Sequence, residues 1–424
     1  MTSRFAPDPT LDHRRGTVRL QVIDERGRAL AENDILVEQT RHELAFGNIG
    51  FDLIGHANGE EEASALADDW LGLFDTATLP FYWGRFESER GKPDTERLRT
   101  AARWFRDHGA AVKGHPLVWH TVKAEWLDPL PLSQVERLTR ERIRREVTDF
   151  AGLIGSWDVI NEVIIMPDFV NEPDDVPNAI SRLARRLGRV EMVRLAVEEA
   201  RAADPTAVLV LNDFDLSPAY ERLIEEVLDA GIRLDAIGLQ THMHQGYWGE
   251  EVMLATIDRF AHFGLPLQLT ETTLLSGELM PAEVVDLNDY QPADWPSTPQ
   301  GEQRQADEIV RHYRSLVGHP AVSSITYWGI TDRGSWLAAP GGLLRADGSR
   351  KPAYGALHEL IRGEWWMPPT VLRTDPDGYI RVSGFAGDYR VSRDSTEASF
   401  HISAGDVDTS PSARLAPRPP RDTD

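Results

Sequence analysis

The sequence of 424 residues contains no cysteine. This absence excludes disulfide bonds, cysteine nucleophiles and zinc sites ligated by cysteine, so catalysis must use other side chains. It does not fix the cellular compartment, because many secreted bacterial enzymes also lack cysteine.

Long apolar stretches are missing as well. No run of about 18 or more apolar residues occurs, so the sequence predicts no membrane-spanning helix. The first residues, MTSRFAPDPTLDHRRG, lack the apolar segment of a secretory signal peptide. We therefore predict a cytoplasmic protein, or a secreted one if a signal peptide has already been removed.

Positive charge is scarce relative to negative charge. The chain has 45 Lys and Arg against 68 Asp and Glu, which gives a formal net charge of -23. So acidic a chain repels phosphate backbones and anionic lipids, which argues against nucleic acids and membrane surfaces as partners. No glycine-rich phosphate loop follows the first predicted strand and no cluster has calcium-loop spacing, so no cofactor is predicted. The sequence does not indicate the oligomeric state.

Residues 42–365 alternate short apolar runs with amphipathic helical stretches. Alternating strands and helices indicate a parallel sheet, and eight such units favour closure into a barrel. A barrel with one small accessory module also fits the length of the chain. We therefore predict an α/β fold, a (β/α)8 TIM barrel. Its eight expected strands are 42–49, 74–82, 110–119, 155–162, 207–213, 236–242, 266–272 and 323–331.

The two chain ends have a different pattern. Residues 14–41 alternate apolar and polar positions around a turn, which predicts a β-hairpin, and 366–403 have the same character. Each end is too short to be stable alone, so we expect both to pack together as one accessory β-module. We expect a flexible lead over 1–13. The stretch 404–424 is rich in Pro, Ser, Asp and Arg, which predicts a disordered tail.

Polar and aromatic side chains collect where the predicted barrel strands end, and these carboxyl ends are where barrels of this kind hold their active sites. The mixture of carboxylates, imidazoles, amides and indoles suits a sugar, whose hydroxyls accept and donate hydrogen bonds and whose C–H faces lie against aromatic rings. The residues at these ends are His115, Trp119, His120, Trp157, Asp158, Asn161, Glu162, Asn212, Asp213, Gln240, His242, His244, Glu271, Trp328, Asp332 and Trp336.

Two carboxylates among them suit glycoside cleavage. Glu162 closes the fourth predicted strand and Glu271 closes the seventh, so both face the same mouth of the barrel. A retaining glycosidase needs such a pair, one carboxyl to protonate the leaving oxygen and one to attack the anomeric carbon. Burial or a neighbouring anion would keep the acid protonated near neutral pH.

Six sequence motifs make the chain resemble glycoside hydrolase family 10, the retaining endo-β-1,4-xylanases. The resemblance covers about 42–362, most of the chain. GHPLVWH and WDVINE are similar to the family's GHTLVWH and WDVVNE, and LTE is similar to its ITE. IGLQTHMH, YWGITDRGSWL and KPAY resemble further family segments. These motifs occupy 114–120, 157–162, 269–271, 237–244, 327–337 and 351–354.

The resemblance implies a role for each matching residue. Glu162 would be the acid/base and Glu271 the nucleophile, as part of a double displacement on β-linked xylose-containing chains or oligosaccharides. The remaining residues would bind substrate, Asn161 at the sugar 2-hydroxyl, His115 at another hydroxyl, and Gln240 and His242 beside the two glutamates. Aromatic walls would come from Trp119, Trp328 and Trp336. For His120, His244, Trp157 and Asp158 we expect structural roles.

The chain departs from the family after the second predicted strand. Family 10 xylanases usually carry Glu-Asn-x-x-Lys-Trp there, whose polar residues bind the sugar on the non-reducing side, whereas this chain has TLPFYW at 78–83. Val122 stands near the place of a family glutamine. Thr272 and Thr273 follow the nucleophile where the family has Leu-Asp, so we expect His242 to have a different partner here.

These departures leave alternatives open. Weaker action on polymeric xylan and better action on short or aryl-linked β-glycosides is one alternative. A non-catalytic carbohydrate-binding barrel is a remote one, and a metal-dependent hydrolase is disfavoured because the histidines are badly spaced for one ion. Residues that would rebuild the glycone side are Tyr82, Arg85, Glu87, and Tyr290 and Trp295 in loop 276–300, although the loop residues are as consistent with shielding the barrel rim.

Overall fold

The computed structural model describes residues 9–170 and 176–418. The chain divides into two compact units. The larger comprises 46–312 and 321–354, and the smaller comprises 1–45, 313–320 and 355–424.

A closed barrel of eight parallel strands forms the larger unit, in the spatial order β10-β3-β4-β5-β6-β7-β8-β9. Each predicted barrel strand contains one observed strand or overlaps it, which confirms the (β/α)8 fold. The strands are β3 (Ala45–Ile49), β4 (Thr76–Pro80), β5 (Ala111–His115), β6 (Ser156–Asn161), β7 (Val208–Asp213), β8 (Ala236–Met243), β9 (Leu267–Leu274) and β10 (Val322–Tyr327).

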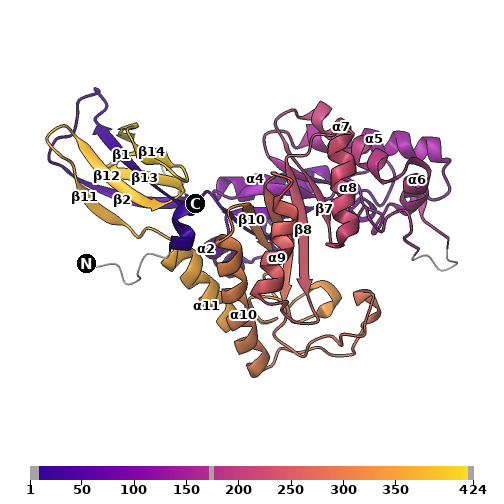
Figure 1. Cartoon of the computed structure of the whole chain (residues 1–424). Helices are drawn as coiled ribbons and strands as arrows, with labels where there is room; N and C mark the ends of the chain where they lie inside the picture. Colours follow the sequence, from indigo (N-terminus) through magenta and orange to yellow (C-terminus); the bar gives the residue numbers. More distant parts are fainter. Residues whose placement is uncertain (1–8, 171–175, 419–424) are drawn as a thin grey trace. The chain divides into compact units, whose positions relative to one another are not determined.

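Helices connect successive barrel strands and lie outside them (Figure 1), and the last helix of the chain follows the eighth strand. In the described part of the chain, none of these helices is long and apolar enough to cross a lipid bilayer. The helices are α1 (Ile54–Ala57), α2 (Ser64–Leu73), α3 (Trp83–Phe86), α4 (Thr95–Asp107), α5 (Leu132–Asp149), α6 (Ala179–Leu187), α7 (Arg189–Ala203), α8 (Pro218–Asp229), α9 (Glu250–Ala261), α10 (Pro299–Val317) and α11 (Pro352–His358).

Two of the sequence motifs pack against each other inside the barrel wall. A Cβ atom on Gly114 would lie 2.1 Å from the Trp157 ring, so glycine is needed there for the indole to fit. Trp157 is fully buried and its ring lies 4.8 Å from that of Phe81. The tryptophan therefore has the structural role expected for it, and it fixes β6 next to β5.

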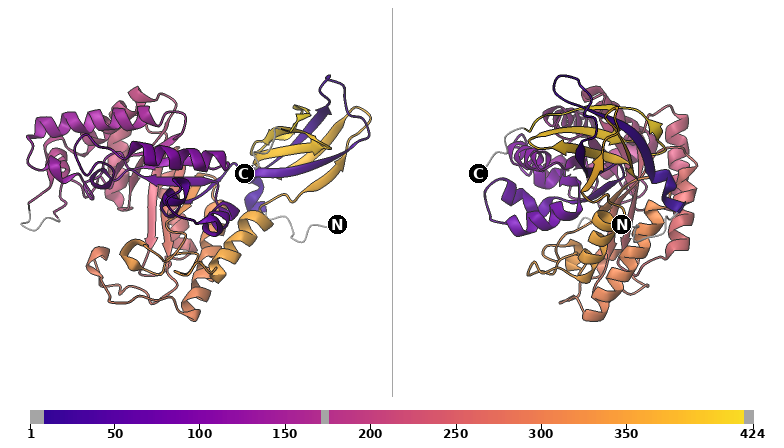
Figure 2. Two further views of the ribbon diagram at one scale, coloured as in Figure 1. Left: turned by 180° about the vertical axis from the view of Figure 1, so that it is seen from behind. Right: turned by 90° about the vertical axis from the view of Figure 1, so that its left-hand side faces the viewer.

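Strands from both chain ends build the smaller unit and lie side by side, indigo beside yellow in Figures 1 and 2. One sheet has the order β12-β1-β15, with β16 also paired to β1, and the other has the order β11-β2-β13-β14-β17. This is the expected β-module. Its strands are β1 (Arg15–Ile23), β2 (Asp34–His42), β11 (Thr370–Arg373), β12 (Tyr379–Phe385), β13 (Gly387–Arg393), β14 (Thr396–Ile402), β15 (Val407–Thr409), β16 (Ser412–Arg414) and β17 (Ala416–Pro417).

The predicted N-terminal hairpin over 14–41 is wrong, because β1 and β2 belong to different sheets. Val18 and Leu20 on β1 and Ile35 and Val37 on β2 meet in one buried cluster. The alternating pattern correctly predicts two half-buried strands. Apolar alternation does not tell edge-to-edge pairing from face-to-face packing, and here the apolar faces pack against each other.

The predictions for the two extreme ends also need correction. Within the expected tail 404–424, three short strands pair with β1 and β14, and Ala413 and Leu415 are each only 2% exposed. Within the expected flexible lead 1–13, Pro9–Arg14 forms a 3-10 helix with Leu11 buried. The composition of 404–424 favours disorder, but β1 and β14 supply the hydrogen-bond partners that this segment lacks on its own. Residues 1–8 and 419–424 lie outside the described residues.

Candidate active site

The carboxyl ends of the barrel strands bring the two glutamates into one hydrogen-bond network. Glu162 directly follows β6, and Glu271 lies within β9. Asn212 at the end of β7 links the two sides: its Nδ2 donates to Glu271 Oε1 over 2.9 Å and to Asn161 Oδ1 over 2.8 Å. Asn161 Nδ2 in turn donates to Glu162 Oε1 over 3.2 Å. The parallel register of the barrel thus joins residues that are far apart in sequence.

Glu162 is a buried carboxyl in a setting that favours its protonated form. Burial, and next the negative charge of Glu271, raise its pKa to about 8. Trp119 Nε1 donates to Glu162 Oε2 over 2.8 Å, and Gln240 Nε2 lies 3.4 Å from Oε1. The indole hydrogen bond opposes the rise in pKa without cancelling it. A carboxyl with this pKa carries a proton at neutral pH and is able to donate it.

The backbone at Glu162 adopts an uncommon conformation. Its φ angle is +55°, in the left-handed region that residues with a Cβ rarely enter. The Glu162 amide donates to the Asn212 carbonyl over 2.9 Å, which anchors the turn to β7. Such strained positions cluster at functional sites, where the surrounding structure holds them.

Glu271 is held from both sides by donors. Asn212 binds Oε1, and His242 Nε2 lies 3.2 Å from Oε2. On the other side of the imidazole, His242 Nδ1 lies 2.9 Å from Thr273 Oγ1. The arrangement in which the threonine hydroxyl donates to Nδ1 leaves Nε2–H to donate to the carboxylate. The different partner expected for His242 is therefore Thr273.

A small amide network fixes Asn161. Gln240 Nε2 donates to Asn161 Oδ1 over 3.0 Å, beside the bond from Asn212. Thr270 Oγ1 donates to Asn212 Oδ1 over 2.6 Å, which fixes which end of the Asn212 amide faces Asn161. With its oxygen occupied by two donors, Asn161 directs its NH2 group toward Glu162. Gln240 therefore lies where the sequence predicted, on the Glu162 side of the site.

His115 joins the site to a buried ion pair. His115 Nδ1 lies 2.8 Å from Asp158 Oδ2, and Lys113 Nζ lies 2.8 Å from Asp158 Oδ1. Burial opposes ionisation of Asp158, but Lys113 and His115 outweigh it and lower the pKa of the carboxyl. His115 Nε2 lies 4.0 Å from Glu271 Oε1. Asp158 thus orients the other edge of the His115 ring toward Glu271.

Aromatic rings surround these polar groups. The Trp328 ring lies 5.2 Å from that of His115, and the Trp336 ring lies 4.8 Å from that of His242. Trp336 is 38% exposed, so part of its ring is open to solvent. Together with Trp119 beside Glu162, all three predicted indoles are at the site.

Two further aromatic residues belong to the site. The Tyr82 ring lies 5.6 Å from His115 and 5.5 Å from Trp119, and Phe51 lies between Tyr82 and Trp328 at 6.0 and 5.9 Å. Tyr82 was among the residues proposed to rebuild the glycone side. Phe51 was missed, although its place directly after the first barrel strand was a usable signal.

Two other expected glycone-side residues have structural roles. Glu87 is 3% exposed, pairs with Arg145 over 2.6 Å and accepts a hydrogen bond from Trp83 Nε1 over 3.2 Å. Trp295 packs in a small apolar cluster with Leu275, Met280 and Ala339 and donates to the Glu278 carbonyl over 2.8 Å. The suggestion that Glu87 binds sugar is therefore wrong, and Trp295 holds the loop together.

His120 and His244 are buried neutral imidazoles. Each is 1% exposed, and burial lowers the pKa of each to about 3. His120 Nε2 lies 4.0 Å from Glu162 Oε2, and His244 packs 5.0 Å from the Trp336 ring. Both support the walls of the site. Among the residues that the structure describes, no group of three or more His, Asp or Glu side chains is placed to hold a metal ion.

Comparisons with known proteins agree with this geometry. The profile of Glycosyl hydrolase family 10 matches residues 58–360. The endo-1,4-beta-xylanase B of Thermotoga neapolitana is 26% identical over 299 residues, covering 66% of this chain and 78% of that protein. The endo-1,4-beta-xylanase A of Cellvibrio japonicus is 30% identical over 284 residues, covering 61% of this chain but only 46% of that protein. An endo-1,4-beta-xylanase/feruloyl esterase of Xylanibacter ruminicola is 25% identical, and the match spans 39% of its length.

Solved structures show the same fold. Xylanase 10B from Thermotoga petrophila RKU-1, determined in complex with xylobiose, has a TM-score of 0.61 at 21% identity and covers 76% of this chain and 95% of its own. A thermostable mutant of Xyn10A from Cellvibrio japonicus also has a TM-score of 0.61, at 23% identity, and covers 76% and 98%. At these identities the likeness supports the barrel fold alone.

Proposed function

Because this chain belongs to glycosyl hydrolase family 10, we propose that it is a retaining β-glycoside hydrolase of the endo-1,4-β-xylanase type. It cleaves β-linked xylose-containing chains or oligosaccharides by double displacement. The observation that carries the proposal is the contrast between two buried glutamates in one network. Glu162 has its pKa raised to about 8, whereas Glu271 is held by donors on both oxygens.

The chemistry begins with Glu162 as the acid. Its carboxyl donates a proton to the glycosidic oxygen while Glu271 attacks the anomeric carbon, and the bond to the leaving sugar breaks. The product of this step is a glycosyl ester on Glu271. Glu162, now a carboxylate, takes a proton from water as that water attacks the same carbon and releases Glu271. Two inversions at one carbon give net retention.

The surrounding residues bind and orient the sugar in this proposal. Asn161 hydrogen-bonds the 2-hydroxyl, a contact that strengthens in the transition state. His115 binds a neighbouring hydroxyl, and Trp328 and Trp336 provide faces for the sugar rings. Gln240 and His242 hold the two glutamates in position. Two alternatives are not favoured, because the relatives are named as endo-xylanases. One is a retaining β-glycosidase that acts on short or aryl-linked β-glycosides rather than xylan, and the other is a barrel that binds carbohydrate without catalysis.

The stereochemistry of the first product tests the mechanism. Proton NMR during early turnover of a xylo-oligosaccharide should show the β anomer first, followed by slow mutarotation. Initial release of the α anomer would rule out double displacement at Glu162 and Glu271. Absence of any turnover would remove the enzymatic proposal itself.

A further inference from the structure

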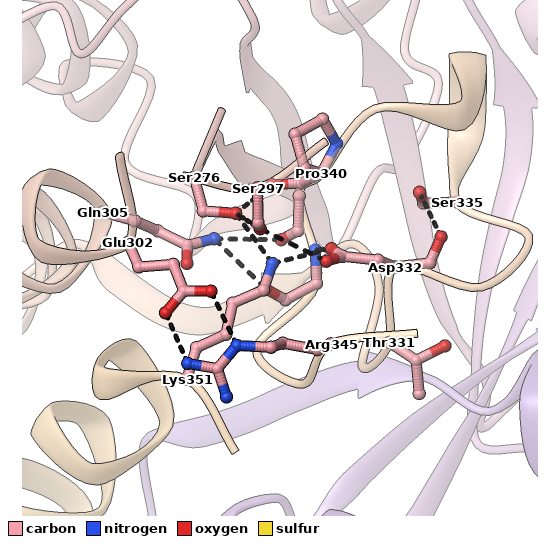
Figure 3. A network of polar contacts seen from close by, with 12 residues as sticks. Ser276, Ser297, Glu302, Gln305, Thr331, Asp332, Ser335, Pro340, Arg345 and Lys351 are labelled. Carbon is pink, nitrogen blue, oxygen red and sulfur yellow. Dashed lines mark hydrogen bonds and ion pairs between the residues drawn. The ribbon is translucent and has the colours of Figure 1, made fainter. Parts of the chain in front are cut away.

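A buried lysine ties together the two loops that follow β9 and β10 (Figure 3). Lys351 lies just before α11, and its side chain is 0% exposed. The ammonium group donates to Asp332 Oδ1 over 2.7 Å, to Ser276 Oγ over 2.8 Å and to the Gly342 carbonyl over 2.8 Å. Lysine has three N–H donors, so each of them has an acceptor. These acceptors belong to the segments that follow β9 and β10.

The segment after β10 forms a closed loop from Asp332 to Gly342. At its base, Asp332 N donates to the Leu344 carbonyl over 3.1 Å, and Gly342 N donates to Asp332 Oδ1 over 2.9 Å. A Cβ atom on Gly342 would lie 2.3 Å from the Thr331 carbonyl carbon, so only glycine permits the two ends of the loop to cross this closely. Asp332 is therefore the point where the loop and Lys351 are joined.

Trp336 stands at the tip of this loop, on a strained turn. Leu337 and Ala338, which follow it, have φ angles of 61° and 54°. Two consecutive residues with a Cβ are unfavourable in this left-handed region and persist only where the surroundings hold them. Ser335 Oγ donates to the Asp332 carbonyl over 3.1 Å, which connects the tip back to the base.

We propose that Lys351 is a positioning residue that acts through Asp332 on Trp336. By neutralising Asp332 and closing the base of the loop, it keeps the exposed face of Trp336 beside His242, where a sugar ring stacks on it. The inference rests on the proposed glycosidase function and deepens it. Among the described residues, neither Lys351 nor Asp332 has a hydrogen bond or ion pair with Glu162 or Glu271. The Lys351–Asp332 ion pair, called the clamp below, therefore affects substrate affinity rather than proton transfer.

The test measures kcat and KM of Lys351→Met on an aryl β-xylobioside. Loss of a stacking surface weakens the ground state and the transition state equally, so KM should rise about tenfold while kcat changes little. The pH profile should keep its shape, because no titrating group of the reaction is touched. A fall in kcat with unchanged KM would overturn the assignment.

A double-mutant cycle separates positioning from general structural damage. In a Trp336→Ala background, Lys351→Met should cause no further rise in KM, because the residue through which it acts is gone. Effects that multiply in the double variant would show that Lys351 acts elsewhere.

A nearby ion pair provides the control. Arg345 pairs with Glu302 on α10, Nε to Oε1 over 2.7 Å, in the same region of Figure 3 but outside the Trp336 loop. Arg345→Ala should leave KM unchanged, even where the melting temperature falls. Should Lys351→Met not fold, Asp332→Asn tests the same clamp with an isosteric side chain. If the wild-type enzyme is active and the Lys351 and Asp332 variants have an unchanged KM, this inference alone is wrong. If the wild-type enzyme has no activity, the proposed function is wrong too.

Discussion

The side-chain amide of Asn212 donates a hydrogen bond to Glu271, Nδ2 to Oε1 over 2.9 Å. Because the same NH2 group also donates to Asn161, Asn212 couples the proposed nucleophile to the residue proposed to bind the sugar 2-hydroxyl. Asn212 is fully buried, so these hydrogen bonds are shielded from bulk solvent.

Asn212→Ala should reduce kcat/KM by about 10- to 100-fold, since a hydrogen bond to a charged group contributes roughly 1.5–3 kcal/mol. Steady-state kinetics on an aryl xyloside measures this change in kcat/KM. Thr270→Val is the matched control, because it removes only the donor to Asn212 Oδ1 and should cost less. A loss from Thr270→Val as large as that from Asn212→Ala would contradict a direct role for Asn212.

The pKa of about 8 for Glu162 sets the basic limb of the pH profile. Glu162 must be protonated to act as the acid, so kcat/KM should be sustained below that pH and fall as pH rises through it. The limb should move in opposite directions in two variants. Trp119→Phe removes a hydrogen bond that lowers the Glu162 pKa, so the limb shifts to higher pH. Asp213→Asn removes a charge that raises this pKa, so the limb shifts to lower pH.

Kinetics across the pH range for both variants provides the measurement. Asp213 is itself buried, with a pKa raised by burial to about 7, and it accepts a hydrogen bond from the Ile164 amide over 3.0 Å. Asparagine keeps an acceptor at this position. Shifts of the same sign in Trp119→Phe and Asp213→Asn would show that Glu162 is not the group titrating in that limb.

Much of the site was predictable because each residue's position at a strand end can be recognised from its sequence neighbours. Glu162 and Glu271 each end an apolar run, and in a parallel barrel all such ends face one mouth, so their neighbourhood follows from strand order alone. The link made by Asn212 was not predictable from the residue type, because it depends on the registers of β7 with β6 and β8 and of β8 with β9. The sequence shows that the aspartate usual in the family is missing after Glu271, but it does not identify Thr273 as the partner of His242.

The fold of the smaller unit was less predictable for a physical reason. Alternation in β1 identifies Val18 and Leu20 as buried, but it does not say what covers them. Pairing between β1 and β12 joins segments separated by most of the chain, and no local pattern encodes such a contact. The polar and proline-rich neighbours of Leu415 predict disorder, although its side chain is buried.

The two glutamates should respond differently to replacement. Glu271→Ala should abolish turnover, because no glycosyl ester can form, and added azide should partly restore it as a glycosyl azide of inverted configuration. Glu162→Ala should impair substrates with poor leaving groups far more than activated aryl glycosides, since only the former need protonation. The rates of both variants on a series of aryl glycosides with different leaving groups distinguish the role of Glu162 from that of Glu271. Retention of more than about a tenth of wild-type activity by Glu271→Ala would contradict its role as nucleophile.

The C-terminal strands should contribute to the stability of the smaller unit. β16 pairs with β1, and Leu415, which directly follows it, is 2% exposed within the same apolar cluster as Val22. Deleting 404–424 removes that pairing and uncovers the edge of β1, so the melting temperature should fall or solubility should drop. Leu415→Ala should destabilise by about 2–5 kcal/mol, the range for a buried leucine.

Deleting only 419–424 leaves all three strands in place and serves as the control. Differential scanning calorimetry of the three variants gives the comparison. Equal melting temperatures for the 404–424 and 419–424 deletions would mean that strands β15 to β17 add no stability to the module.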